Sequence, residues 1–206
     1  MSSYLGNNDI TKMKEVINKT LKILLIGLVP AIILLFYYSN VVIFIVAGNN
    51  YLQGTVPLQL LSIALLFAII SSLLTTNIMI PNRQENKITI IVTISALSNI
   101  ILNYLMIPIF GASAASITTV IAEMIVCIGS IIYTKSYIEF KKLFFVISKI
   151  LLASFFMLLI LFIVSIFNLS GILELFIGSI IACIGYIFCL IALKIRSIKE
   201  FIKIAK

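Results

Sequence analysis

Six long apolar stretches constrain this chain more than any other feature of its sequence. A bilayer core about 30 Å thick is crossed by roughly 20 helical residues, because backbone amides in lipid must be hydrogen-bonded within their own segment. Hydrophobic residues make up 62% of the chain and charged residues only 11%, which excludes a soluble globular domain. The sequence therefore predicts an all-α fold, an integral membrane bundle of six transmembrane helices.

Three parts of the chain are distinguished by composition. A cytoplasmic amphipathic flank is predicted at 1–20, the membrane bundle at 21–193 and a basic cytoplasmic tail at 194–206. The segment 40–53 is predicted as the frayed outer end of the first helix or a short interfacial turn. The helices of the bundle are predicted at about 21–39, 56–80, 88–107, 112–133, 147–167 and 172–193.

The flank has the pattern of a helix that lies on a membrane surface. Ile10, Met13, Val16 and Ile17 fall on one helical face, and lysines occupy the other faces. The flank has no short apolar core followed by a small-residue cleavage site, so the first apolar helix is expected to act as an uncleaved anchor.

The basic residues predict the orientation in the membrane. All 15 lie at every second connection or terminus of the predicted bundle: before the first helix, between helices two and three, between helices four and five, and after helix six. The loops near Gly48, Pro108 and Ser170 contain none. Since Lys and Arg resist translocation, both termini are predicted to be cytoplasmic.

Several classes of function are disfavoured by composition. The net charge of +8 would suit a nucleic-acid binder, but the chain has too little polar surface for one. The chain has no histidine, its three cysteines show no CxxC spacing, and no span contains paired carboxylates. We therefore expect no metal, no cofactor and no enzymatic activity.

Glu123 is the ionisable group placed most deeply in a predicted span. An acid at a helix centre costs roughly 2.5–3.5 kcal/mol on insertion scales, so this residue should face other helices or a wet cavity. At 1.5 Å per residue, Asn99 lies about 13 Å from Pro108, and Glu123 about 18 Å from Gly111, so a hydrogen bond between the two side chains is feasible.

Other polar and small residues extend this site along the same two helices. Asn103 shares a face with Asn99 and is predicted to lie level with Ser116. Gly111, Ala115 and Thr119 form a stripe that would let the fourth helix approach its neighbour closely.

Two interpretations of these groups stay open. They either fasten the third and fourth helices together, or Glu123 takes up and releases a proton during transport or contacts a polar substrate. Pro30, in the first helix, is either a simple kink or a hinge.

The stretch SNIILNYLMIPIFGASAASITTVIAE, at 98–123, has a specific arrangement of polar, proline, glycine and small residues. It resembles the C-terminal half of bacterial polysaccharide flippases, in the MATE-like superfamily that also contains multidrug and toxin extruders and the lipid II flippase. Ser113 departs from that pattern, because the family often has a second glycine there. The matching positions are Asn99, Leu102, Asn103, Ile107, Pro108, Gly111, Ala114, Ala115, Thr119 and Glu123.

The resemblance extends weakly over almost all of the chain. The segment 46–54 looks like the family's turn after its seventh helix, and the opening residues look like the linker between its two lobes. The resemblance implies that the chain is the second six-helix lobe of a transporter in the bacterial cytoplasmic membrane. Its expected partner is the missing N-terminal lobe or another copy.

The expected substrate is an undecaprenyl-diphosphate-linked oligosaccharide, moved between the lobes by alternating access for surface polysaccharide synthesis. A diphosphate needs cations, and this chain has them only at its cytoplasmic rim. Two alternatives remain, a lobe of a cation-coupled multidrug extruder and a membrane scaffold that transports nothing. The rim cations are Lys22, Arg83, Lys87 and Lys149.

Overall fold

The computed structural model of the chain describes residues 10–167 and 170–194, and these residues fold into helices joined by short connections. Six of the helices are long and apolar enough to cross a membrane, which confirms the predicted all-α fold. The predicted basic tail lies outside the described residues, except for its first residue, Lys194. The helices are α2 (Ile10–Tyr37), α3 (Ser39–Ala47), α4 (Thr55–Leu74), α5 (Glu85–Phe110), α6 (Ala112–Thr134), α7 (Phe140–Ser165) and α8 (Gly171–Ala192).

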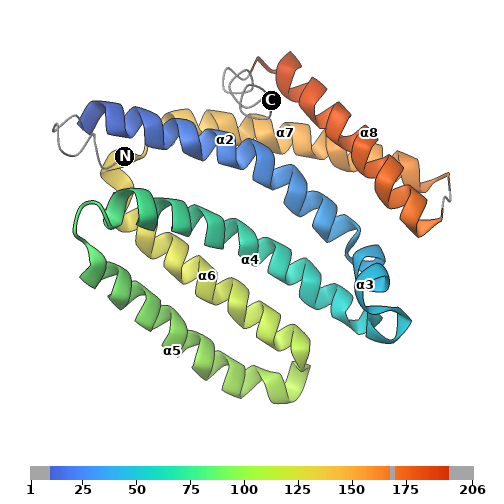
Figure 1. Cartoon of the computed structure of the whole chain (residues 1–206), viewed down its shortest axis with the longest axis horizontal. Coiled ribbons are helices and arrows are strands. Elements are labelled where there is room, and N and C mark those ends of the chain that lie inside the picture. The colour runs from blue at the N-terminus through green and yellow to red at the C-terminus, as the bar shows by residue number, and fades with distance from the viewer. Residues whose placement is uncertain (1–9, 168–169, 195–206) are drawn as a thin grey trace.

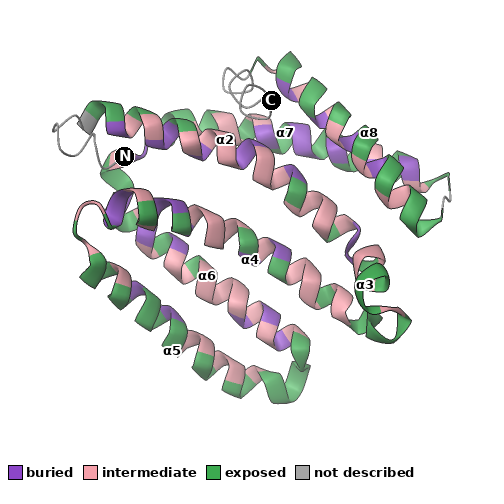
Figure 2. Ribbon diagram, in the orientation of Figure 1, coloured by how far each residue is buried: buried purple, intermediate pink, exposed green. Residues whose placement is uncertain are grey.

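The long helices form two groups that share α2. Helix α6 packs against both α4 and α5, and α7 packs against α8. Helix α2 packs against α4 on one side and α7 on the other, so it connects the two groups (Figure 1). Most of the surface of α5 is exposed, because α6 is its main neighbour (Figure 2).

Three segments that carry basic residues meet at one end of the molecule. The Asn18 side chain of α2 donates to the Tyr137 carbonyl at 2.8 Å and accepts from the Glu139 amide at 2.8 Å. The Tyr137 hydroxyl donates to Asn82 Oδ1, in the α4–α5 connection, at 3.3 Å. This end therefore gathers lysines and an arginine from the start of α2 and from the α4–α5 and α6–α7 connections.

The structure corrects the predicted role of the N-terminal flank. Residues 10–20 are not a separate surface helix but the first turns of α2, which continues without a break into the first span. Met13 and Ile17 are 1% and 0% exposed, since they pack with α4 and with Ile138 of the α6–α7 connection. Met13 and Ile17 thus pack against the bundle itself, where the prediction placed their face against lipid.

Other helix ends also differ from their predicted positions, and the largest of these differences is the start of α7 at Phe140, seven residues before the predicted position. The chain after Tyr38 continues as the short helix α3, and a 3-10 segment (Asn49–Gly54) leads into α4. Helix α5 continues through Pro108 to Phe110, so the turn into α6 is made by Gly111 alone. Gly111 has φ 56°, a left-handed backbone conformation that glycine adopts without steric cost.

Candidate functional site

A chain of neutral hydrogen bonds links the middle of α5 to α6. Asn103 Nδ2 donates to Asn99 Oδ1 at 2.7 Å, one helical turn away. Thr118 Oγ1, on α6, lies 2.6 Å from Asn103 Oδ1 and donates to it. Nearer the basic end, Ser95 Oγ donates to the Ala122 carbonyl of α6 at 2.8 Å. Between membrane helices such bonds contribute roughly 0.6 kcal/mol each, because the separated helices find other partners.

Asn99 and Asn103 share a face, as predicted, but the bond that joins Asn103 to α6 was not predicted. Asn103 bonds to Thr118, whereas the Ser116 hydroxyl donates to the Ala112 carbonyl of its own helix. The predicted Thr119 likewise bonds within α6, to the Ala115 carbonyl. Adjacent residues on a helix differ by about 100° of rotation, which the depth count along the chain could not resolve.

The expected bond between Asn99 and Glu123 is not formed among the residues that the structure describes. Glu123 follows Ala122, whose carbonyl is on the α5 side of the helix. Its own face also carries the buried Cys127 and Ser130, at spacings of one and two turns. The other main neighbour of α6 is α4. Glu123 is half-buried on α6, and no described side chain or backbone group hydrogen-bonds to its carboxylate.

The four predicted rim cations have different environments. Lys149 Nζ donates to the Leu193 carbonyl, at the C-terminal end of α8, at 2.7 Å. The Lys87 ammonium lies 4.9 Å from the centre of the Tyr133 ring, in a cation–π contact. Lys22 is half-buried on α2, and Arg83 is exposed in the α4–α5 connection. Two of these four cations therefore also hold parts of the bundle together.

Pro30 lies inside α2 and is buried. Helix α2 curves along its length (Figure 1), as expected of a helix with an internal proline. The sequence alone did not identify the residue that compensates for the hydrogen bond that this proline removes.

Two hollows lie near the end of the bundle opposite the basic connections. One has a volume of about 370 Å³ and lies between α3, the following 3-10 segment and the start of α8. The other, of about 530 Å³, is a shallow depression on α5 beside Asn103, Tyr104 and Pro108. The second hollow places the neutral polar cluster of α5 next to accessible surface.

A comparison with known proteins found a relative that matches nearly the whole chain. The chain is 31% identical, over 202 residues, to the uncharacterized membrane protein MJ1068 of Methanocaldococcus jannaschii. This chain is a multi-pass membrane protein. The alignment covers 97% of the chain but 39% of that relative, so the chain spans about two fifths of the length of the protein it matches. No protein-family model and no solved structure matches the chain.

Proposed function

We propose that this chain is one six-helix lobe of a flippase that moves lipid-linked oligosaccharides across the cytoplasmic membrane. The main support is that 97% of the chain aligns with 39% of a larger membrane protein. A relative more than twice as long as the aligned region has room for a second six-helix unit, as in transporters built from repeated lobes. The resemblance of 98–123 to polysaccharide flippases suggests the substrate class.

The polar groups of the membrane region suit such a substrate. Asn99, Asn103 and Thr118 provide neutral donors and acceptors that can bond to sugar hydroxyls when the cluster opens. Lys22 and Arg83, at the basic end, can attract the diphosphate as it enters from the cytoplasm. The second lobe would supply the remaining cations.

Glu123 is our candidate for coupling transport to protons. A carboxylate that is not fixed by hydrogen bonds and lies between packed helices can gain or lose a proton as the helices move. In this proposal, α4 and α6 separate or close according to the charge on that group. The chain is expected to have both ends in the cytoplasm and to catalyse no covalent reaction.

Reconstitution would test the proposal. The chain, with and without a matched N-terminal lobe, is placed in liposomes that contain a fluorescent polyprenyl-diphosphate-linked oligosaccharide. Dithionite then quenches only the label exposed outside, so flipping increases the quenched fraction. We expect flipping only when both lobes are present, and at least a tenfold slower rate for Glu123→Gln. The matched control Met124→Leu, at an exposed neighbouring position, should transport normally.

Equal transport rates for Glu123→Gln and the Met124→Leu control would remove the coupling role. Absence of flipping with any matched lobe would remove the flippase assignment.

The same carboxylate favours a second candidate, a lobe of a cation-coupled multidrug extruder, because an acidic group can also attract a lipophilic cation. Cells that express both lobes would then resist cationic dyes, and Glu123→Gln would abolish that resistance. A scaffold would lack both activities, and in that case the substitution would change only the stability of the bundle.

A further inference from the structure

Pro30 leaves one carbonyl of α2 without its helical partner. In a regular α-helix the carbonyl of Ile26 accepts from the amide of residue 30, but proline has no amide hydrogen. Ile26 is 2% exposed, so water does not reach its carbonyl to replace the missing donor. A buried carbonyl without a partner costs about 1–3 kcal/mol, and the cost is at least as high in lipid.

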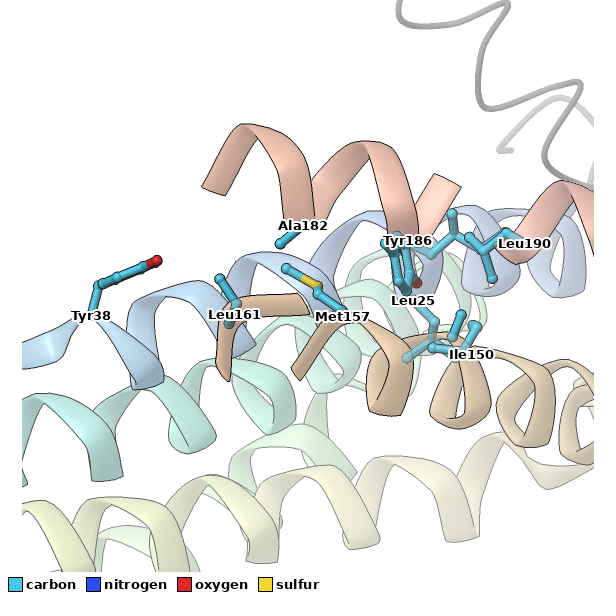
Figure 3. Close-up of a cluster of buried hydrophobic side chains, with 10 residues drawn as sticks. Leu25, Tyr38, Ile150, Met157, Leu161, Ala182, Tyr186 and Leu190 are labelled. Atoms are coloured by element: carbon cyan, nitrogen blue, oxygen red, sulfur yellow. The ribbon is translucent and has the colours of Figure 1, made fainter. Parts of the chain in front are cut away.

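A tyrosine from the last helix supplies the missing donor. The Tyr186 hydroxyl of α8 donates to the Ile26 carbonyl at 3.1 Å. Tyr186 is also 2% exposed, and its ring packs among side chains of α2, α7 and α8 (Figure 3). The hydroxyl therefore reaches the carbonyl that the internal proline leaves without its helical donor.

A second tyrosine ties α2 to α8 on the other side of Pro30. The Tyr38 hydroxyl, at the α2–α3 junction, donates to the Glu174 carbonyl at 3.1 Å. It lies against Gly178, where any larger residue would collide with it. Helix α8 thus holds α2 at two levels, one before and one after the proline.

We propose that α2 is a hinge at Pro30 and that Tyr186 is the clasp that holds it in the bent form. While the hydroxyl donates to the Ile26 carbonyl, the bent helix has no unsatisfied polar group at this position, and α8 supports α2 on both sides of the bend. When the hydroxyl leaves, the carbonyl is exposed to the bundle interior and α2 can change its angle. The hinge does not depend on the substrate, and it stands whether or not the proposed flippase assignment holds.

A double-mutant cycle separates this role from ordinary packing. Tyr186→Phe removes the hydroxyl, and Pro30→Ala restores an amide donor to Ile26. The four proteins, each as the full chain in bicelles, are compared by reversible unfolding. With Pro30 present, Tyr186→Phe should lower the folding equilibrium constant about 3- to 18-fold, which corresponds to the average and the largest values measured for hydrogen bonds between membrane helices. In the Pro30→Ala background, the same change should lower it less than about twofold, because the carbonyl then has its helical partner.

Hydrogen exchange followed by mass spectrometry reports on the hinge itself. Amides of α2 around Pro30 should exchange at least three times faster in Tyr186→Phe than in the native chain, and the Pro30→Ala change should abolish that difference. Tyr38→Phe is the matched control, since the Glu174 carbonyl keeps its bond within α8. Its effect should be the same in the native and the Pro30→Ala backgrounds.

If Tyr186→Phe lowers the folding equilibrium constant equally in the two backgrounds, Tyr186 does not have the proposed role of a clasp. If the amide exchange rates around Pro30 do not change, α2 has no hinge there. If Tyr186→Phe alone does not fold, rescue by Pro30→Ala supports the proposal. Failure of that rescue contradicts it.

Discussion

The two helix groups of this membrane protein are held together by different kinds of side chain. Between α5 and α6 the contact is small and polar, with Asn103, Thr118 and Ser95 bonded across it. The Ile91 side chain of α5 packs directly against Gly129 of α6, nearer the basic end. The group of α2, α7 and α8 is filled instead by large apolar residues such as Met157 and Leu161 (Figure 3).

This difference reflects what a bilayer offers as a solvent. Lipid tails are as apolar as leucine, so burying a leucine between membrane helices gains little from the hydrophobic effect. Membrane helices are therefore held together by close packing, hydrogen bonding and the avoidance of voids. The α5–α6 contact is stabilised by close packing at small residues and by hydrogen bonds. The α2–α7–α8 contact is stabilised by large apolar side chains that fit into one another. Substitutions should therefore harm the two groups by different mechanisms.

Removing volume should have the largest effect, in the α2–α7–α8 group. Leu161 is 0% exposed, and Leu161→Ala leaves a void that rigid neighbours fill poorly. We expect a loss of about 3 kcal/mol in the free energy of unfolding, near the low end of values for water-soluble cores, because transfer to lipid adds little. Unfolding in bicelles measures it, and the exposed Leu159→Ala should change little. Similar losses for both variants would mean that α7 is not packed as described.

Adding volume should be the larger perturbation of the α5–α6 contact. A Cβ at Gly129 would lie 2.8 Å from Ile91 Cγ2, and the rest of the Ile91 side chain surrounds it. Gly129→Leu should therefore cost about 2 kcal/mol by overpacking. Unfolding of the double variant Gly129→Leu, Ile91→Ala gives the control, since it should recover part of that loss. Additive losses in the double variant would contradict close contact at this position.

The sequence predicted the polar character of the α5–α6 contact better than that of the other group. Asn99, Asn103 and Glu123 stand out in an apolar sequence, and counting residues from the turn predicted their depths. Rotation about the helix axis was not predictable in that way, and so the bond from Thr118 to Asn103 was not predicted. Depth follows from the number of residues, whereas rotation follows from packing with neighbouring helices.

The apolar group was less predictable because its important residues look like all the others. Tyr186 lies in a run of apolar residues, and nothing in the sequence relates it to Pro30, far away in the chain. The one available signal was that a buried internal proline always leaves a carbonyl that needs a donor. Similarly, Met13 and Ile17 show a helical stripe, but the pattern does not indicate whether lipid or protein covers it.

Removing one hydroxyl tests the polar contact more gently than adding volume. Thr118→Val keeps the shape of the side chain but leaves Asn103 Oδ1 without its donor from α6. A loss of about 1 kcal/mol in the free energy of unfolding is expected, within the range for bonds between membrane helices. Thr118→Ser retains the hydroxyl and should cost less. If serine and valine are equally harmful, the methyl group and its packing matter more than the bond.

The smallest effect should come from the charged bond at the edge of the apolar group. Lys149 donates to the Leu193 carbonyl at the end of α8, where a positive charge also favours the helix dipole. Lys149→Met should lower the free energy of unfolding by about 0.5 kcal/mol and speed amide exchange in the last turn of α8. Lys141→Met, at an exposed position on the same helix, is the control and should change neither.

This measurement also distinguishes the two roles assigned to Lys149. If the residue mainly attracts a diphosphate, the methionine variant should unfold normally and lose transport in the two-lobe liposome assay. If it mainly caps α8, the variant should lose stability first, and raising the salt concentration should reduce the difference only partly, since the bond is half-buried. If Lys149 caps α8, the α2–α7–α8 group is also stabilised by a polar bond, at the end of one of its helices.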